Sequence, residues 1–359
     1  MTPALSGGLS RPPEFPVSEE TPANDQALDE ILSRPTPGAL ATLDSLDGDV
    51  LVLGVGGKMG PTLARMLRRG FDLRNKTNAV IGVARFSDPE ARERLEGEGV
   101  QTVRCDLTDR AAVEALPDAP NVLFMAGQKF GTTQAPEATW VMNTYAPALV
   151  AQRFAGSRIV AFSTGSVYAN VPVFSGGSRE SDATEPLGDY ANSAIGRERV
   201  FTFFARQNDT PLALVRLNYA IDLRYGVLVD VARRVHAGEP IDVTTGHVNV
   251  IWQGDANAQA VQCFSHVAVP PFVVNVAGPE TVSVRALAHR FGELMDRAPV
   301  FAGEEAETAL LSNAGRAHQL FGYPTVALEQ MVAWTAEWLK RGGRLLNKPT
   351  GYETRDGRY

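Results

Sequence analysis

The sequence predicts an α/β fold, in which a doubly wound parallel sheet carries helices on both faces and a smaller C-terminal lobe follows. Two observations predict it. From residue 49 to about residue 217, short apolar runs alternate with segments of helical periodicity. A cluster of glycines directly follows the first apolar run. Beyond residue 219 the elements alternate less regularly, which indicates a separate lobe.

Residues 1–45 are expected to form an N-terminal arm and a short helix. The first 23 residues are rich in proline and poor in large apolar side chains, which favours a mobile arm. Asn24 is a candidate N-cap for a helix that carries Leu28 and Leu32 and ends before Pro35. We expect this helix to pack on the main domain or, alternatively, against a dimer partner.

Residues 46–215 are expected to contain the sheet. The first strand is the apolar run at residues 50–53, which is typical of a strand buried on both faces. Apolar residues at helical spacing then predict a helix that ends at Gly70. Further strands are expected at residues 79–84, 101–104, 122–125, 158–162 and 212–217.

Residues 216–342 are expected to form mainly a substrate-binding lobe, and residues 343–359 a tail. Periodicity predicts helices at residues 226–237, 256–264, 284–295 and 328–339. The apolar stripe of the last helix is expected to face the core.

Composition narrows the function. Lys and Arg number 34 against 41 Asp and Glu, so charge gives no reason to expect nucleic acid as a partner. No apolar run approaches the roughly 20 residues of a membrane span. Cys105 and Cys263 lie far apart in the sequence, which excludes a disulfide framework or a CxxC zinc site, and both are expected to be buried. These cysteines and an N-terminus unlike a signal peptide favour the cytoplasm.

The glycine cluster has the spacing of a phosphate-binding loop. Gly54, Gly57 and Gly60 form a GxxGxxG pattern between a strand and a helix. Such glycines provide a tight turn, close backbone approach to a pyrophosphate and close helix packing, and the helix N-terminus attracts the phosphates. The sequence therefore predicts a Rossmann-type dinucleotide site. Its contacts in this loop are predicted to be Gly54, Gly56, Gly57, Lys58, Met59 and Gly60.

The end of the second strand favours NADP over NAD. An NAD-selective fold usually places Asp or Glu there, whereas this chain has Arg85, whose guanidinium suits a 2′-phosphate. Alternatively, Arg85 is a solvated surface charge. After the third strand, Asp106 is placed to accept a hydrogen bond from the adenine amine, with Leu107 beside it. The expected cofactor is NAD(P), with NADP favoured.

These motifs resemble those of the extended short-chain dehydrogenase/reductase family, the nucleotide-sugar epimerase and dehydratase group, over about residues 49–342. The resemblance rests on the glycine loop, Cys105-Asp106-Leu107, Met125-Ala126-Gly127, the segment 163–168, and Tyr190 with Glu198 beyond it. It implies further cofactor contacts at Ala126, Gly127, Lys129, Asn143 and Tyr190.

The resemblance also implies catalytic roles. Thr164 takes the position of the hydroxyl that orients the substrate oxygen, with Ser163 and Ser166 as alternatives. Tyr190 takes the position of the acid/base that exchanges a proton with the substrate while a hydride moves to or from the cofactor. In the family this Tyr belongs to a YxxxK motif, but here Ala194 replaces the Lys.

The missing ammonium group bears directly on the chemistry. An unperturbed phenol has a pKa of about 10 and is a poor base at neutral pH without a neighbouring cation. Lys129 is one candidate for the missing cation. Arg197 is another, because it lies two helical turns after Tyr190; alternatively, Arg197 forms a surface ion pair with Glu198.

The substrate side departs from the family as well. Relatives that bind a nucleotide diphosphate usually carry an Arg shortly before the position of Asp255, and none stands there. A UDP- or dTDP-sugar is therefore not the expected substrate. The side chains that can line a pocket for a smaller polar or sugar-like substrate, each alternatively structural, are His247, Asn249, Trp252 and Gln253.

The expected function is an NAD(P)-dependent oxidoreductase, epimerase or dehydratase that acts by hydride transfer on a sugar-like or other hydroxy or keto substrate. Ala194 leaves two alternatives open: a dinucleotide-binding sensor or partner subunit with little activity, and non-redox chemistry on the same fold. The resemblance suggests a homodimer through the helix that carries Tyr190. Phe201, Phe203 and Phe204 of that helix fit such an interface and a core position equally well.

Overall fold

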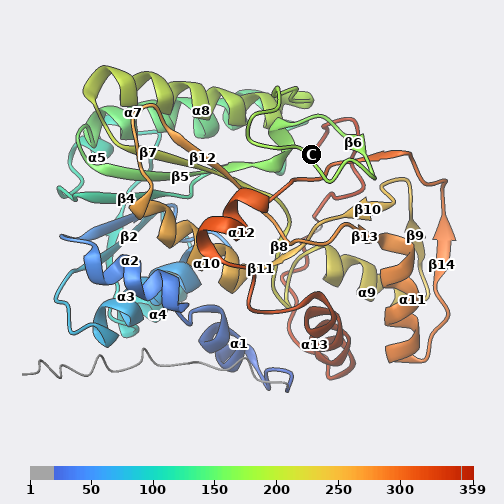
Figure 1. Ribbon diagram of the computed structural model, residues 1–359. Helices are drawn as coiled ribbons and strands as arrows, with labels where there is room; N and C mark the ends of the chain where they lie inside the picture. Colours follow the sequence, from blue (N-terminus) through green and yellow to red (C-terminus); the bar gives the residue numbers. More distant parts are fainter. Residues whose placement is uncertain (1–19, 349) are drawn as a thin grey trace, which may run out of the picture.

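The computed structural model describes residues 20–348 and 350–359, and its centre is a seven-stranded parallel sheet (Figure 1). The strand order is β12-β7-β5-β4-β1-β2-β3, so the direction of winding reverses between β1 and β4. Such a reversal opens a crevice at the carboxyl ends of the strands, where ligands bind in open α/β sheets. The strands are β1 (Val50–Leu53), β2 (Val80–Ala84), β3 (Gln101–Arg104), β4 (Asn121–Phe124), β5 (Arg158–Thr164), β7 (Leu212–Leu217) and β12 (Phe272–Val276).

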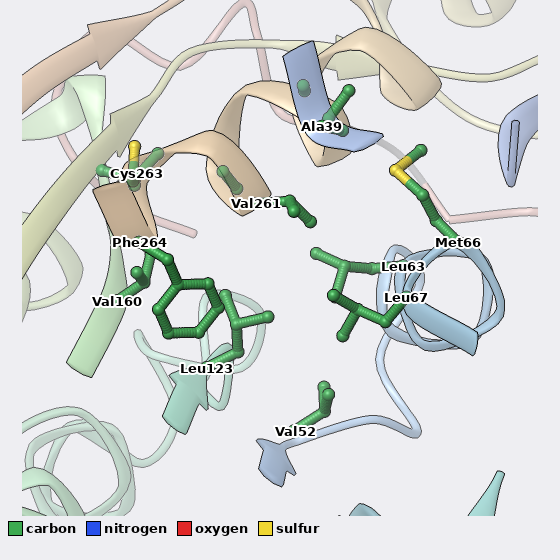
Figure 2. Close-up of a cluster of buried hydrophobic side chains, with 14 of the residues drawn as sticks. Ala39, Val52, Leu63, Met66, Leu67, Leu123, Val160, Val261, Cys263 and Phe264 are labelled. Carbon is green, nitrogen blue, oxygen red and sulfur yellow. The ribbon is translucent and has the colours of Figure 1, made fainter. Parts of the chain in front are cut away.

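Helices cover both faces of the sheet (Figure 1). The helices on one face are α2 (Pro37–Ser45), α3 (Gly60–Leu73), α4 (Pro89–Gly97) and α10 (Gln253–Gln262). Those on the other face are α5 (Arg110–Glu114), α7 (Ala146–Arg153) and α8 (Gly188–Asn208). Because side chains alternate along a strand, β1 sends Val52 to the first face and Leu51 to the second. Figure 2 shows the first core, where Leu63 of α3, Phe264 after α10 and Val52 of β1 belong to one buried cluster.

The C-terminal lobe has a hydrophobic core of its own. Its helices are α9 (Val227–Ala237), α11 (Val284–Met295) and α13 (Leu328–Lys340). Trp334 of α13 meets Trp252 edge to face, with ring centres 5.5 Å apart. Leu28 and Leu32 of α1 (Asp25–Leu32) are buried in the same core, and Glu30 pairs with Arg69 of α3. Helix α1 therefore joins the lobe to the sheet.

Short elements complete the fold. The helices are α6 (Pro136–Trp140), a π-helical turn (Val141–Tyr145), 3-10 turns at Gly165–Val167 and Cys263–Ser265, and α12 (Gly315–Phe321). The strands are β6 (Val171–Pro172), β8 (Ala220–Ile221), β9 (Pro240–Asp242), β10 (His247–Val248), β11 (Ile251–Trp252), β13 (Val282–Ser283), β14 (Val300–Ala302) and β15 (Thr308–Ala309). No helix within the described residues has both the length and the apolar character needed to cross a bilayer.

The sheet and most helices confirm the sequence predictions. Asn24 caps α1 by accepting the Ala27 N–H at 2.9 Å, and both cysteines are buried. Two helix boundaries were wrong: α10 begins at Gln253, three residues before the predicted start, and α3 continues three residues past Gly70. A Cβ at Gly70 would lie 2.2 Å from a methyl carbon of Leu43, so this glycine allows α2 to approach α3 and does not end the helix.

Helix α2 and strand β12 were not expected from the sequence. Strand β12 returns to the sheet after the chain has passed residue 216, so the predicted substrate-binding lobe, residues 216–342, also contains one strand of the sheet. The boundary between the two domains at this residue stays a prediction. Most of the proposed N-terminal arm, residues 1–19, lies outside the described residues.

A buried ion pair ties the helix of Tyr190 to the sheet. Arg216 of β7 donates to Glu198 of α8 through two nitrogens, at 2.9 and 2.7 Å, and both side chains are less than a tenth exposed. Ser163 of β5 donates to the same carboxylate at 2.6 Å. Arg216 also donates to the Tyr168 hydroxyl, which in turn donates to Asn275 of β12. One network thus joins α8 to three strands.

Replacing Glu198 with Ala should lower the free energy of unfolding by about 3–5 kcal/mol, because it leaves the buried Arg216 charge without a partner. Urea unfolding measures this loss. Glu114→Ala removes a partner from the exposed Arg110–Glu114 pair and serves as the control, with an expected loss of less than about 1 kcal/mol. Equal losses in the two variants would contradict the importance of the buried pair.

Candidate active site

The glycine loop bends sharply between β1 and α3. Gly54 has φ +89°, and a Cβ there would lie 2.6 Å from the Ala126 nitrogen, so only glycine fits. The Gly57 N–H donates to the Gly54 carbonyl at 3.0 Å and closes the turn. A Cβ at Gly60 would lie 2.3 Å from the Val55 carbonyl oxygen, which explains the third glycine. Met59, at the N-cap, makes no side-chain capping bond to the helix.

A cavity of about 430 Å³ lies beside this loop, at the carboxyl ends of β1, β2, β3 and β4; we call it the glycine-loop cavity. Gly56 and Gly57 line it, and having no side chains they leave the backbone accessible to a phosphate. The lining residues that the sequence predicted as cofactor contacts are Gly54, Gly56, Gly57, Arg85, Asp106, Leu107, Ala126 and Gly127. The shape and chemistry therefore fit a dinucleotide.

A second cavity of about 190 Å³, the inner cavity, continues from the same loop. Lys58 and Met59 line it, although their neighbours Gly56 and Gly57 line the glycine-loop cavity. Five predicted site residues meet here, namely Lys58, Met59, Lys129, Thr164 and Tyr190. Ser163 and Ser166, the alternatives to Thr164, line it too.

The three hydroxyl side chains that line the inner cavity, Ser163, Thr164 and Ser166, lie at or just after the end of β5. Thr164 accepts the Ser166 N–H at 3.1 Å and so caps the 3-10 turn that follows the strand. Ser163 is held by Glu198, as described above. The Ser163 hydroxyl therefore already donates to a buried carboxylate. The Thr164 hydroxyl lines the cavity, and its hydrogen bonds are to Ser166, two residues away.

Ala194 stands where the family motif has its Lys, and its surroundings are apolar. Ala194 is buried in α8 and packs against Val167 and Tyr168. The next residue towards Tyr190, Ser193, donates to the Tyr190 carbonyl at 2.8 Å. No cation therefore approaches Tyr190 from its own helix at residue 194.

Lys129 approaches Tyr190 from the opposite side. Its ammonium nitrogen lies 5.8 Å from the centre of the Tyr190 ring and donates to the Thr350 carbonyl at 2.8 Å. It also lies 4.2 Å from the centre of the Tyr359 ring. Burial lowers the pKa of Lys129 to about 8, although the carboxylates of Asp230 and Glu353 act in the other direction.

Lys58 faces the same cavity as Lys129. The residue as a whole is exposed, but its ammonium nitrogen lies 3.0 Å from the centre of the Tyr225 ring. Shielding of the ammonium end from solvent, together with repulsion by Lys129 and Lys348, lowers the pKa of Lys58. The inner cavity therefore brings two lysine side chains together in a chain whose net charge is -7.

Arg197 does not form the expected surface ion pair with Glu198. The residue is buried and donates to the Phe162 carbonyl and to the Asn143 side-chain oxygen, both at 2.8 Å. The reason is that Glu198 is already bonded to Arg216 within the core. These contacts position Asn143 and the end of β5, and Arg197 also interacts electrostatically with Tyr190, although it does not line the inner cavity.

Several predicted residues lie outside the cavities. Asn143 lines neither cavity; its amide bonds both the N–H and the carbonyl of Gln128 and so holds the segment that carries Lys129. Gly60 lies under the loop. Gln253 is the one of the four predicted substrate-side residues that lines the inner cavity. Trp252 belongs to the lobe core, and Asn249 accepts the Ser312 N–H at 2.8 Å.

Sequence reasoning missed the contribution of residues 344–348 and 350–359, which we call the strap. Lys348 lines the glycine-loop cavity, Thr350 lines the inner cavity, and Tyr359 packs on Tyr190. The strap carries neither a motif nor helical periodicity, so no local signal pointed to it. Tyr219 and Tyr225, also in the inner cavity, were missed for the same reason.

A family model described as "NAD dependent epimerase/dehydratase family" matches residues 50–257, more than half of the chain. The chain belongs to this family. A search of curated protein sequences gave no match. The matched segment contains the glycine loop, Thr164 and Tyr190, so the family assignment covers both cavities' central residues.

Solved structures show the same fold at low sequence identity. The UDP-glucose 4-epimerase of Thermotoga maritima is 18% identical with a TM-score of 0.65, over 82% of this chain and 99% of that one. The UDP-glucose 4-epimerase of Thermus thermophilus, solved with NAD, is 18% identical with a TM-score of 0.67, over 81% and 99%. The epimerase Mth375 of Methanothermobacter thermautotrophicus is 19% identical with a TM-score of 0.69, over 86% and 97%.

The Lys129 ammonium should lose its proton as the pH rises through about 8, about two units below an ordinary lysine, because burial disfavours its charged form. With only five lysines in the chain, ¹³C NMR of ¹³C-lysine-labelled protein can follow each one. The Lys129→Arg spectrum identifies the signal. Titration of that signal together with ordinary lysines near pH 10 would contradict the buried placement.

Proposed function

We propose that this protein is an NAD(P)-dependent enzyme that acts by hydride transfer on a hydroxy or keto substrate, as in epimerisation, dehydration or simple redox chemistry. One observation carries the proposal: Tyr190, Thr164 and Lys129 meet in a cavity that continues from a phosphate-binding glycine loop. Family membership supports the same class of reaction.

The residues that would hold the cofactor are those of the glycine-loop cavity. The backbone of Gly56 and Gly57 and the N-terminus of α3 suit the pyrophosphate, and Arg85 suits a 2′-phosphate. NAD in the Thermus thermophilus relative supports a dinucleotide of this kind, and Arg85 is the reason to favour NADP. When bound, the nicotinamide supplies the hydride acceptor or donor.

The chain's own groups handle the proton. The Tyr190 hydroxyl donates or accepts the proton of the substrate oxygen, and the Thr164 hydroxyl orients that oxygen by a hydrogen bond. The Lys129 ammonium, 5.8 Å from the centre of the Tyr190 ring, lines the inner cavity together with Tyr190 and Thr164. In this scheme Lys129, which follows β4 in the chain, supplies the positive charge that the Lys of the family motif would supply at the position of Ala194.

A different class of function has one observation in its favour. Ala194 is packed against Val167 and Tyr168, so no lysine-like side chain reaches Tyr190 along its own helix. A dinucleotide-binding sensor or partner subunit with little activity would retain the glycine-loop cavity while lacking the catalytic tetrad. Measured turnover, or its absence, of hydroxy and keto substrates by cofactor-saturated protein separates the two classes.

We also propose a homodimer through α8 and the adjoining π-helical turn. More than a third of the surface is exposed at Val141 and Tyr145 of the turn, at Phe203 of α8 and at Trp140, the last residue of α6, whereas Phe201 is buried in the core. Exposed aromatic side chains at one surface are typical of protein interfaces.

Tyr190→Phe should lower kcat by about 100- to 10,000-fold, because it removes the only hydroxyl proposed to exchange the substrate proton. Cofactor affinity should remain within about threefold of the wild type, since the ring is retained. Steady-state kinetics and a binding titration measure the two effects. Tyr323→Phe, an exposed tyrosine of the lobe, is the control. Unchanged kcat in Tyr190→Phe would contradict the mechanism.

The protein should bind NADP or NAD. Arg85→Ala should lower the affinity for NADP by about 10- to 100-fold, because a charged hydrogen bond to the 2′-phosphate is lost, and should leave the affinity for NAD nearly unchanged. Calorimetry with the four dinucleotide forms measures this. Arg94→Ala on the exposed face of α4 is the matched control. Binding of none of the four would contradict the dinucleotide assignment, and an unchanged NADP affinity would remove Arg85 from it.

A further inference from the structure

The strap crosses from the lobe to the sheet over the candidate active site; Figure 1 places the C-terminal end of the chain between these two parts. On the lobe side, its backbone and side chain at Thr350 both donate to Asp230, at 2.9 and 2.7 Å. Tyr352 is buried in the lobe core, and Glu353 pairs with Arg234 of α9 at 2.8 Å. The strap is therefore a packed part of the fold.

On the sheet side, the strap ends against the helix of Tyr190. A Cβ at Gly357 would lie 2.2 Å from the Leu187 carbonyl oxygen, so the backbone there packs directly on the start of α8. The Tyr359 carbonyl accepts the Thr133 N–H at 3.1 Å. The Tyr359 ring meets the Tyr190 ring edge to face, with centres 5.5 Å apart, and its hydroxyl lies close to Ser166.

This placement puts Tyr359 between two cavities. The inner cavity of about 190 Å³ contains Tyr190 and Thr164. An outer cavity of about 320 Å³ lies beyond it and is lined by Tyr359, Leu187 and Arg355, among others. Ser166 lines both cavities, so the Tyr359–Ser166 contact lies on the boundary that separates them.

The inner cavity is small for a binding site. Pockets for drug-sized ligands usually span about 300–1,000 Å³, and the inner cavity alone lies below that range. Joined to the outer cavity it would lie within the range. A substrate that carries a nucleotide in addition to its reacting part would need both spaces, and the Tyr359 ring stands in the way.

We propose that Tyr359 is a specificity-determining residue that restricts the site to a small hydroxy or keto substrate without an attached nucleotide. The inference rests on the proposed function, because it names the substrate class of that same site. It agrees with the lobe, where the stretch from His247 to Asp255 contains no Arg and where Trp252 and Asn249 are engaged in packing and hydrogen bonds.

The barrier can be tested without a known substrate. Thr164→Cys places a thiol in the inner cavity, and Cys105 and Cys263 are buried. In NAD-saturated protein, we measure the labelling rates of this thiol with methyl methanethiosulfonate, which is small, and fluorescein-5-maleimide, which is large. Ser181→Cys, at an exposed position, gives the intrinsic rate ratio of the reagents, and the parent protein gives the background.

The small reagent should label the introduced thiol whether or not Tyr359 is replaced. Changing Tyr359 to Ala should speed the large reagent by at least about tenfold, because access limits the reaction of a recessed thiol. Tyr359→Phe keeps the ring and should retain the slow rate, which separates the effect of the ring from that of its hydroxyl. Tyr359→Val is the second truncation should the Ala variant unfold, as judged by circular dichroism.

Two results would overturn the proposal. One is an unchanged rate for the large reagent in both truncated variants. The other is binding of UDP-glucose to NAD-loaded wild-type protein, measured by calorimetry, as tightly as to Tyr359→Ala. Labelling needs no turnover, so hydride transfer is measured separately in wild-type protein, which retains Thr164. A faster large-reagent rate in Tyr359→Ala, together with no hydride transfer by the wild-type protein, would support the barrier and contradict the proposed function.

Discussion

The buried pair between Glu198 and Arg216 is the interaction on which the arrangement of the site depends. It fixes α8 to β7, and the Ser163 hydroxyl on the same carboxylate fixes both to the end of β5. Tyr190 stands two turns before Glu198 on α8, and Thr164 directly follows Ser163. The distance between the phenol and the hydroxyl that share the inner cavity is thus set by a charge pair in the core. An ion pair in this place acts through geometry more than through net stability.

The fold was largely predictable because its signals are local. Buried strands such as Val50–Leu53 are continuous apolar runs, and the strand-glycine-helix sequence is confined to a few neighbouring residues. Strand β12 was missed because Asn275 interrupts its apolar run; that polar side chain is there to bond Tyr168 and the Ser178 carbonyl. Gly70 was misinterpreted because close helix packing and helix termination favour the same residue.

The site was predictable only where motifs define it. Thr164, Tyr190 and the glycine loop are recognisable from sequence spacing, and the structure brings them together. The partners of Lys129 were not recognisable, because Thr350 lies 221 residues away in the chain and in no motif. The same holds for Arg197, whose neighbour in sequence, Glu198, is engaged elsewhere. Pairings over such separations depend on the tertiary fold, which composition and periodicity do not encode locally.

The hydrogen bond from Lys129 to the Thr350 carbonyl also has a consequence for the order of biosynthesis. At about 5–20 residues per second, a ribosome adds the 221 residues between these partners in roughly 10–40 s. During that time β1 to β7 and the glycine loop can already form, while Lys129 and Tyr190 remain open to solvent. The hydrogen bond between Lys129 and Thr350 can therefore form only after the strands of the central sheet have been synthesised.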